Sequence, residues 1–212
     1  MAPRRHQIRA LVVDYGEVLC HAADPAGLAA MASRVDAEPA AFVAAYWRHR
    51  EGYDRGRLDG AAYWRLVGRS LDIEISDTLV AELVAADIRL WTRLDPEMLA
   101  LVDTVVDSGV PVGLLSNMVR EIGIHLRDEL RLFDRFTSVT YSYEALLAKP
   151  DPAIYECALE SLGVAAKDSL FVDDRVVNVE AARAAGMHAY RFAGRDALVA
   201  EIESRYVLVP RA

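Results

Sequence analysis

The chain has 212 residues, a formal net charge of -8 and 53% hydrophobic residues. This length is enough for one hydrophobic core plus a smaller accessory unit. The negative charge argues against general nucleic-acid binding, which normally requires a basic face. No stretch approaches the roughly 20 apolar residues of a membrane-spanning helix, so the sequence also argues against membrane insertion.

Cysteine is rare in the chain: Cys20 and Cys157 lie far apart and have no partners at metal-ligand spacing. A disulfide framework or a structural zinc site is therefore not expected, and a reducing, cytoplasmic setting fits best. The basic residues near the start are Arg4, Arg5 and His6 with Arg9, and no long apolar segment of a secretory signal follows them. We expect them to form a solvated tail.

The first predicted element is a buried strand from Ile8 to Asp14, because branched apolar residues dominate this stretch. The region that follows has no strand pattern. Its apolar residues instead recur with helical periodicity around 28–35, 42–50, 61–71 and 78–91. We predict a helical bundle over 20–87, inserted into a core domain formed by 1–19 and 88–212.

After Trp91, helices and strands alternate, which is typical of βαβ units in a parallel sheet. Strands are predicted at 110–116, 138–141, 170–172 and 188–192, and helices at 95–109, 119–130, 151–163, 176–185 and 196–206. The predicted fold class is therefore α/β, with a parallel-sheet core and an inserted helical bundle.

Polar residues follow the predicted strands at the end where ligands bind in open α/β sheets. They are Asp14, Ser116, Asn117, Lys149, Asp173 and Asp174. Each residue alone is common in a turn or a helix cap. Together they supply what transfer of a phosphoryl group to a carboxylate requires.

Each residue type in this set has a chemical task. Carboxylates can hold Mg²⁺ next to a phosphate. A hydroxyl group and main-chain amides can donate to the phosphate oxygens, and a lysine can neutralise the nucleophile and the transferred group. A covalent aspartyl phosphate would divide one difficult displacement into two easier ones.

The order of these residues resembles the four motifs of the haloacid dehalogenase superfamily. The motifs are DYGEVL around Asp14, LLSN around Ser116, AKPDPAIYE around Lys149 and FVDDRVVNVEAARAAGM around Asp173. The resemblance covers nearly the whole chain. It implies a Rossmann-like core of the subfamily I type, with the insertion as a helical C1 cap over the active site.

The resemblance also assigns metal ligands by position. Asp14 would be the nucleophile and a Mg²⁺ ligand, and the main-chain carbonyl of Gly16 would be a second ligand. Asp174 would be the acidic ligand of the last motif. Asp173 beside it would hold the metal or a metal-bound water.

The phosphate site follows in the same way. Ser116 and the Asn117 amide would bind the phosphate, and Lys149 would hold the phosphate against Asp14. Asn178 would have a supporting role in the last motif.

Gly16 departs from the family pattern, because most phosphatases of the superfamily carry at this position an aspartate that acts as general acid. General acid–base help is worth about 100- to 10,000-fold in rate. Glu17 and His21 are the candidate replacements. The same DxGxV pattern occurs in sugar-1-phosphate phosphatases and in relatives of the epoxide hydrolase N-terminal domain.

These features predict a Mg²⁺-dependent phosphomonoester hydrolase that acts on a small phosphorylated metabolite, with sugar phosphates as one candidate class. A homodimer is compatible with the sequence. A 2-haloacid dehalogenase is an alternative, because halide leaves without a proton. Those enzymes use no metal, however, and Asp173 and Asp174 would place uncompensated charge beside Asp14. A non-catalytic binding protein is the third possibility.

Two groups of residues in the predicted cap are ambiguous. Five aromatic residues are expected to form mainly the core of the bundle: Tyr46, Trp47, Tyr53, Tyr63 and Trp64. Four arginines are expected on its solvated exterior: Arg48, Arg50, Arg55 and Arg57. An aromatic residue or an arginine at the junction of cap and core could still contact a sugar or acyl substrate.

Overall fold

The computed structural model describes residues 5–211. Its centre is a five-stranded sheet in the order β4-β3-β2-β5-β6, and every neighbouring pair is parallel. The strands are β2 (Ala10–Val13), β3 (Val112–Ser116), β4 (Ser138–Tyr141), β5 (Ser169–Asp173) and β6 (His188–Arg191). The α/β fold class predicted from the sequence is confirmed, and all carboxyl ends lie at one edge of the sheet.

β2 is the central strand, with β3 and β4 on one side of it and β5 and β6 on the other. Its register pairs Val13 with Leu114 of β3 and with Val172 of β5. Asp14 therefore leaves β2 between the ends of two neighbouring strands. The strand order reverses at this point, which is where open α/β sheets form their ligand crevice.

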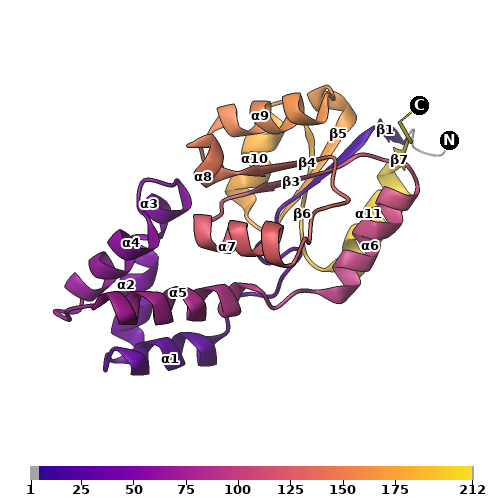
Figure 1. Cartoon of the computed structure of the whole chain (residues 1–212). Helices are drawn as coiled ribbons and strands as arrows, with labels where there is room; N and C mark the ends of the chain where they lie inside the picture. The colour runs from indigo at the N-terminus through magenta and orange to yellow at the C-terminus, as the bar shows by residue number, and fades with distance from the viewer. Residues whose placement is uncertain (1–4, 212) are drawn as a thin grey trace.

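Helices cover both faces of the sheet (Figure 1). α9 (Pro152–Leu162) and α10 (Val176–Ala184) pack on the face that contains Val12 and Phe171. α6 (Pro96–Asp107), α7 (Arg120–Ile124) and α11 (Arg195–Arg205) cover the opposite face. Burial on both faces explains why the strands are continuous apolar runs rather than alternating ones.

Shorter helical turns connect these elements: α8 (Ser142–Ala145), the 3₁₀ turn η2 (Ala166–Asp168) and the π turn η1 (His125–Glu129). The single helix predicted over 119–130 is therefore α7 followed by a π turn. The Leu130 amide donates to the His125 carbonyl, five residues back along the chain. Periodicity does not distinguish one wider turn from a continuing α-helix.

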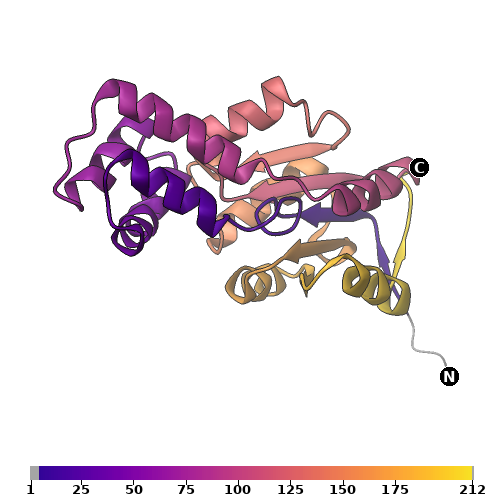
Figure 2. The same ribbon diagram turned by 90° about the horizontal axis from the view of Figure 1, so that it is seen from below.

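The first predicted strand is divided at Arg9. β1 (His6–Ile8) pairs in parallel with β7 (Tyr206–Leu208) in a separate two-stranded sheet, and β7 was not predicted. This small sheet lies at the end of the molecule opposite the inserted helices (Figures 1 and 2). The predicted solvated tail is wrong at His6, which opens β1, and Arg4 lies outside the described residues.

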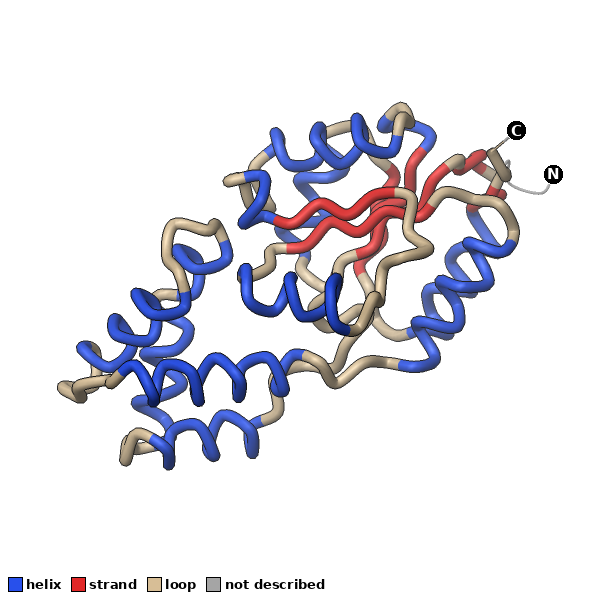
Figure 3. Tube along the Cα trace, in the orientation of Figure 1, coloured by secondary structure: helices blue, strands red, loops and turns tan. Residues whose placement is uncertain are grey.

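The inserted region consists of α1 (Pro25–Arg34), α2 (Pro39–Arg48), α3 (Arg50–Asp54), α4 (Gly60–Arg69) and α5 (Asp77–Trp91). Figure 3 shows it as helix and loop beside the strands of the core. Side chains of Asp24, Glu38, Asp59 and Ser76 cap four of these helices. We call α1–α5 the cap. Position 87 falls inside α5, which continues to Trp91 before the chain returns to the core.

The cap has its own aromatic core. Tyr46, Tyr53, Tyr63 and Trp64 are at most 1% exposed, whereas Trp47 is 47% exposed. The expectation that these aromatics mainly form the core of the bundle is confirmed for four of the five. Among residues 5–211, no helix combines the length and the apolar character needed to cross a membrane.

Gly68 is required by the close packing inside the cap. A Cβ there would lie 2.5 Å from Ile75 Cγ1 and 2.6 Å from the Ile73 carbonyl oxygen, which is part of the backbone. We expect Gly68→Ala to lower the free energy of unfolding by about 1–3 kcal/mol, because overpacking forces the chain to shift. Urea denaturation measures this change.

Gly52→Ala in α3 is the matched control. Its Cβ would meet the flexible end of Leu58 at 3.1 Å, and alanine favours helix over glycine by up to ~1 kcal/mol. Equal unfolding free energies for the two variants would contradict the packing argument.

Candidate active site

A cavity of about 360 Å³ lies between the carboxyl end of the sheet and the cap. Its core side contains Asp14, Tyr15, Gly16, Glu17, Ser116, Asn117, Met118, Ile122, Lys149, Asp174, Arg175 and Asn178, and its cap side contains Trp47, Arg50, Asp54 and Trp91. The structure therefore brings together all the site residues predicted from the sequence, and Asp173 lies beneath the lining, in contact with Lys149. His21 is exposed and is not in the lining.

Lys149 joins two of the carboxylates. Its Nζ lies 2.8 Å from Asp14 Oδ1 and 2.7 Å from Asp173 Oδ2, and its side chain is 1% exposed. Burial alone would lower the pKa of Lys149, but the two carboxylates outweigh this effect and raise it. Lys149 therefore stays an ammonium ion.

The side chain of Asn117 holds the backbone at Lys149. Asn117 Nδ2 donates to the Lys149 carbonyl at 3.0 Å, and the Lys149 amide donates to Asn117 Oδ1 at 2.8 Å. These two bonds fix the loop that carries the lysine to the end of β3. This role of the Asn117 side chain was not predicted from the sequence.

Asp173 is fully buried, and both of its carboxylate oxygens accept hydrogen bonds. Asn178 Nδ2 lies 3.0 and 3.1 Å from the two oxygens, and the Arg175 amide donates to Oδ1 at 2.8 Å. The buried Oδ1 of Asn178 has no partner among the described residues.

The acidic residues at this edge have the chemistry of a divalent-cation site. One carboxylate oxygen each from Asp14, Asp173 and Asp174 lie within 4.8 Å of one another. Burial, with the Asp173 charge added, raises the pKa of Asp14 to about 7 and also raises that of Asp174. Lys149 offsets only one of the three charges. Oxygen donors with uncompensated negative charge fit a hard cation such as Mg²⁺.

Arg50 was predicted to lie on the solvated exterior, and this prediction is wrong. It is buried, its Nε lies 3.0 Å from Asp54 Oδ1, and its Nη1 lies 3.1 Å from Asp87 Oδ2. The chain starts a new helix at Arg50, which turns the guanidinium toward α5. The i, i+4 spacing of Arg50 and Asp54 was a sequence signal for part of this network.

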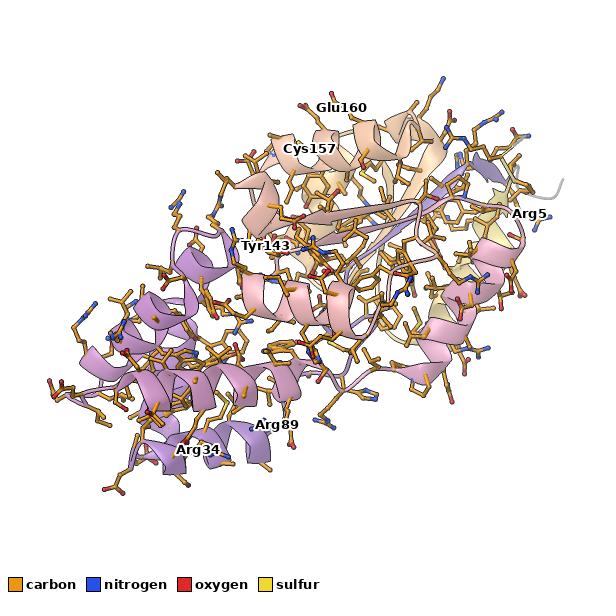
Figure 4. The ribbon with its side chains drawn as sticks, viewed as in Figure 1. Arg5, Arg34, Arg89, Tyr143, Cys157 and Glu160 are labelled. Atoms are coloured by element: carbon orange, nitrogen blue, oxygen red, sulfur yellow. The ribbon has the colours of Figure 1, made fainter. Side chains whose placement is uncertain are left out.

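Contacts between the cap and the core hold the cap beside the cavity. Glu121 of α7 accepts from the Tyr53 hydroxyl at 2.8 Å and from the Gly60 amide at 2.9 Å. The turn that follows α3 packs on Tyr143, which Figure 4 labels at the junction of cap and core. A Cβ on Gly56 would lie 2.9 Å from the Tyr143 carbonyl oxygen, so only glycine permits this close approach.

A family model described as haloacid dehalogenase-like hydrolase matches residues 8–186. A sesquiterpene phosphatase of Aspergillus oryzae is 29% identical over 140 residues, covering 65% of this chain and 68% of that protein. A phosphatase of Mycobacterium tuberculosis is 33% identical over 122 residues, covering 56% of this chain. The match spans 55% of the mycobacterial protein, little more than half of its length.

Solved structures share the fold at low sequence identity. A haloacid dehalogenase family enzyme of Bacteroides thetaiotaomicron, an Asp-to-Ala variant in complex with magnesium and inorganic phosphate, has a TM-score of 0.71 and 21% identity. The match covers 89% of this chain and 96% of that one. L-2-haloacid dehalogenase of Xanthobacter autotrophicus, with chloropropionic acid covalently bound, has a TM-score of 0.68 and 21% identity, covering 93% and 83%.

The buried Arg50–Asp87 pair allows a stability prediction. We expect Asp87→Ala to lower the free energy of unfolding by about 3–5 kcal/mol, because it leaves a buried guanidinium short of a counter-charge. Thermal and urea unfolding measure the loss.

Glu82→Ala, on the same helix α5, is the control. Glu82 pairs with Arg34 at the surface, where the two side chains are 50% and 42% exposed. Removing an exposed pair is expected to cost at most ~1 kcal/mol. A loss of similar size in both variants would contradict the importance of burial.

Proposed function

Because the chain belongs to the haloacid dehalogenase-like hydrolases, we propose that it is a Mg²⁺-dependent phosphomonoester hydrolase. In this proposal the substrate is a small phosphorylated metabolite, and the reaction passes through a phosphorylated Asp14. The observation that carries the proposal is the cluster of Asp14, Asp173 and Asp174 around the single ammonium group of Lys149. Phosphatases among the relatives support the same reaction class.

The two carboxylate oxygens of Asp14 differ in their contacts: those found among the described residues involve Oδ1, which leaves Oδ2 for the reaction. Its Oδ1 accepts from the Tyr15 amide at 2.7 Å and lies 2.8 Å from Lys149 Nζ. We therefore assign the attack on phosphorus to Oδ2. Lys149 lowers the pKa of this carboxyl group against the effect of burial and opposes the charge of the incoming phosphate.

Ser116 and the amides after β3 complete the phosphate site. Ser116 is the last residue of β3 and lines the cavity beside Asn117. A hydroxyl group and main-chain amides at this position can donate to the oxygens of the transferred phosphoryl group. Hydrolysis of the aspartyl phosphate by water would then restore Asp14 and release inorganic phosphate.

Asp14, Asp174 and the Gly16 carbonyl are the residues proposed to hold Mg²⁺, and Asp173 supports them from below. Bound Mg²⁺ would offset the repulsion between these carboxylates and the phosphate dianion. The hydrogen bonds of Asp173 to Lys149 and Asn178 suit a positioning role, because they occupy both of its oxygens. The magnesium and phosphate in the Bacteroides relative support this proposal.

The cavity limits the class of substrate. Its volume of about 360 Å³ suits a small metabolite. Trp47 and Trp91 offer aromatic surface, while Arg50, Asp54 and Arg175 offer hydrogen bonds. A phosphorylated molecule with both apolar and hydroxyl surface fits this lining, and sugar phosphates are one such class.

Hydrolysis of p-nitrophenyl phosphate tests the reaction class, because its phenolate leaves without a proton. We expect turnover that depends on Mg²⁺ and falls by roughly 10,000-fold or more in Asp14→Asn, which removes the nucleophile. Release of p-nitrophenolate is followed by absorbance. Acid quenching and peptide mass spectrometry should locate a phosphoryl group on Asp14.

Asp103→Asn is the matched control, since Asp103 is an exposed aspartate on α6. It should keep the activity of the unmodified chain. Absence of phosphatase activity together with halide release from 2-chloropropionate would replace the proposal with a dehalogenase.

Thermal unfolding tests the metal site without any substrate. We expect Mg²⁺ at 100 times its Kd to stabilise the chain by ~2.7 kcal/mol. The shift should be largely lost in Asp174→Asn and kept in Asp103→Asn. An undiminished shift in Asp174→Asn would contradict the proposed ligand set.

A further inference from the structure

The reaction proposed above leaves one chemical task without a residue. When a phosphate ester of an alcohol is cleaved, the departing oxygen needs a proton, and a positioned acid supplies it at a gain of about 100- to 10,000-fold. Gly16 has no side chain to do this. A Cβ added at Gly16 would lie 3.8 Å from Trp91 Cζ3, so the Trp91 ring occupies the space beside it.

Four carboxyl groups line the cavity: Asp14, Glu17, Asp54 and Asp174. Asp14 and Asp174 already have roles in the proposed function. Glu17 is exposed to solvent, whereas the Asp54 side chain is 20% exposed. Asp54 is therefore the sheltered carboxyl group that remains.

We propose that Asp54, delivered by the cap, is the general acid that protonates the leaving oxygen and the general base that activates the hydrolytic water. This inference rests on the proposed phosphatase function. It replaces both candidates considered from the sequence, Glu17 and His21.

Hydrogen bonds through Ser142 link the backbone of Asp54 to the proposed phosphate site. The Ser142 hydroxyl donates to the Asp54 carbonyl, and the same hydroxyl accepts from the Met118 amide at 2.8 Å. Met118 directly follows Ser116 and Asn117 along the chain. Two hydrogen bonds through one serine thus connect the cap residue to the loop that would bind the phosphoryl group.

The charge balance around Arg50 favours a proton on Asp54. Asp54 and Asp87 share this one guanidinium. Asp87 is 1% exposed and accepts from both Arg50 and the Tyr46 hydroxyl. Asp54 Oδ1 accepts from Arg50, and among the described residues no partner is found for Oδ2.

Burial raises the pKa of Asp54 to about 6, and the negative charge of Asp87 contributes to this rise. The positive charges of Arg50 and Arg175 lower the pKa but do not outweigh burial. A carboxyl group that titrates in this range can both donate and accept a proton near neutral pH. The free Oδ2 is the atom available for this exchange.

The two proton transfers balance. As Asp14 Oδ2 bonds to phosphorus and the ester P–O bond breaks, the proton on Asp54 Oδ2 moves to the leaving oxygen, which departs as an alcohol. Asp54 is then a carboxylate paired with Arg50. It takes a proton from the water that attacks the aspartyl phosphate, which releases phosphate and restores both Asp14 and protonated Asp54.

A series of aryl phosphates tests this role, from p-nitrophenyl phosphate to phenyl phosphate, whose phenolate is a far poorer leaving group. We expect kcat/KM of Asp54→Asn, which reports the transfer of the phosphoryl group to Asp14 and not the later hydrolysis, to fall about 100- to 10,000-fold with phenyl phosphate and far less with p-nitrophenyl phosphate. The dependence of rate on leaving-group pKa should therefore be steeper in the variant. A merely structural role would lower both rates together.

Two further variants sharpen the test. Glu17→Gln should keep the leaving-group dependence of the unmodified chain, and Asp54→Glu should recover part of it. Thermal unfolding in parallel shows whether Asp54→Asn is folded, and Asp54→Glu provides the comparison if it is not.

The outcomes separate this inference from the function it rests on. Turnover of p-nitrophenyl phosphate by the unmodified chain with an unchanged dependence in Asp54→Asn would overturn only the role of Asp54. A steeper dependence in Glu17→Gln would do the same. Absence of Mg²⁺-dependent turnover in the unmodified chain would overturn the proposed function and this inference with it.

Discussion

The concentration of negative charge at one edge of the sheet is the constraint on which the site depends. The parallel register places Asp14 between the ends of β3 and β5, and β5 itself ends on Asp173. Buried carboxylates at this spacing repel one another and resist ionisation. Lys149 relieves part of the repulsion, and its position depends in turn on Asn117, which holds its backbone from the next strand. The remaining negative charge is what suits the site to a divalent cation and a phosphate.

A second buried charge network lies in the cap, and in it too a cation joins two carboxylates. Here one arginine, Arg50, serves two carboxylates, and three aromatic rings surround its guanidinium. Such a network costs desolvation energy and is weak evidence for stability. The network is better explained by its effect on the position of Asp54. Arg50 holds Asp54 in the wall of the cavity, and Asp87 pairs with the same guanidinium on its buried side.

Local sequence patterns were sufficient for the parallel sheet, the inserted helices and the residues at the strand ends. The carboxyl ends of parallel strands must meet, so Asp14, Ser116 and Asp173 could be brought together without coordinates. Arg50 could not be placed in this way, because its burial depends on a turn between α2 and α3 that periodicity did not separate. β7 was missed for a related reason: a three-residue strand has no pattern of its own, and its pairing with β1 joins opposite ends of the chain.

An acid carried by the cap has a consequence that an acid beside the nucleophile does not. A side chain at residue 16 would stay in the core whether the cap were open or closed, and would be present before the substrate is enclosed. In the structure, contacts of the cap with Ser142 and Glu121 hold Asp54 at the cavity, so a cap that moved away would take Asp54 with it. Proton transfer to the leaving group would then require the closed state, in which bulk water is also displaced from the aspartyl phosphate. The chemistry would thus be coupled to the fit of the substrate under Trp47 and Trp91, so a poorly fitting phosphate ester would lose the proton donor as well as binding energy.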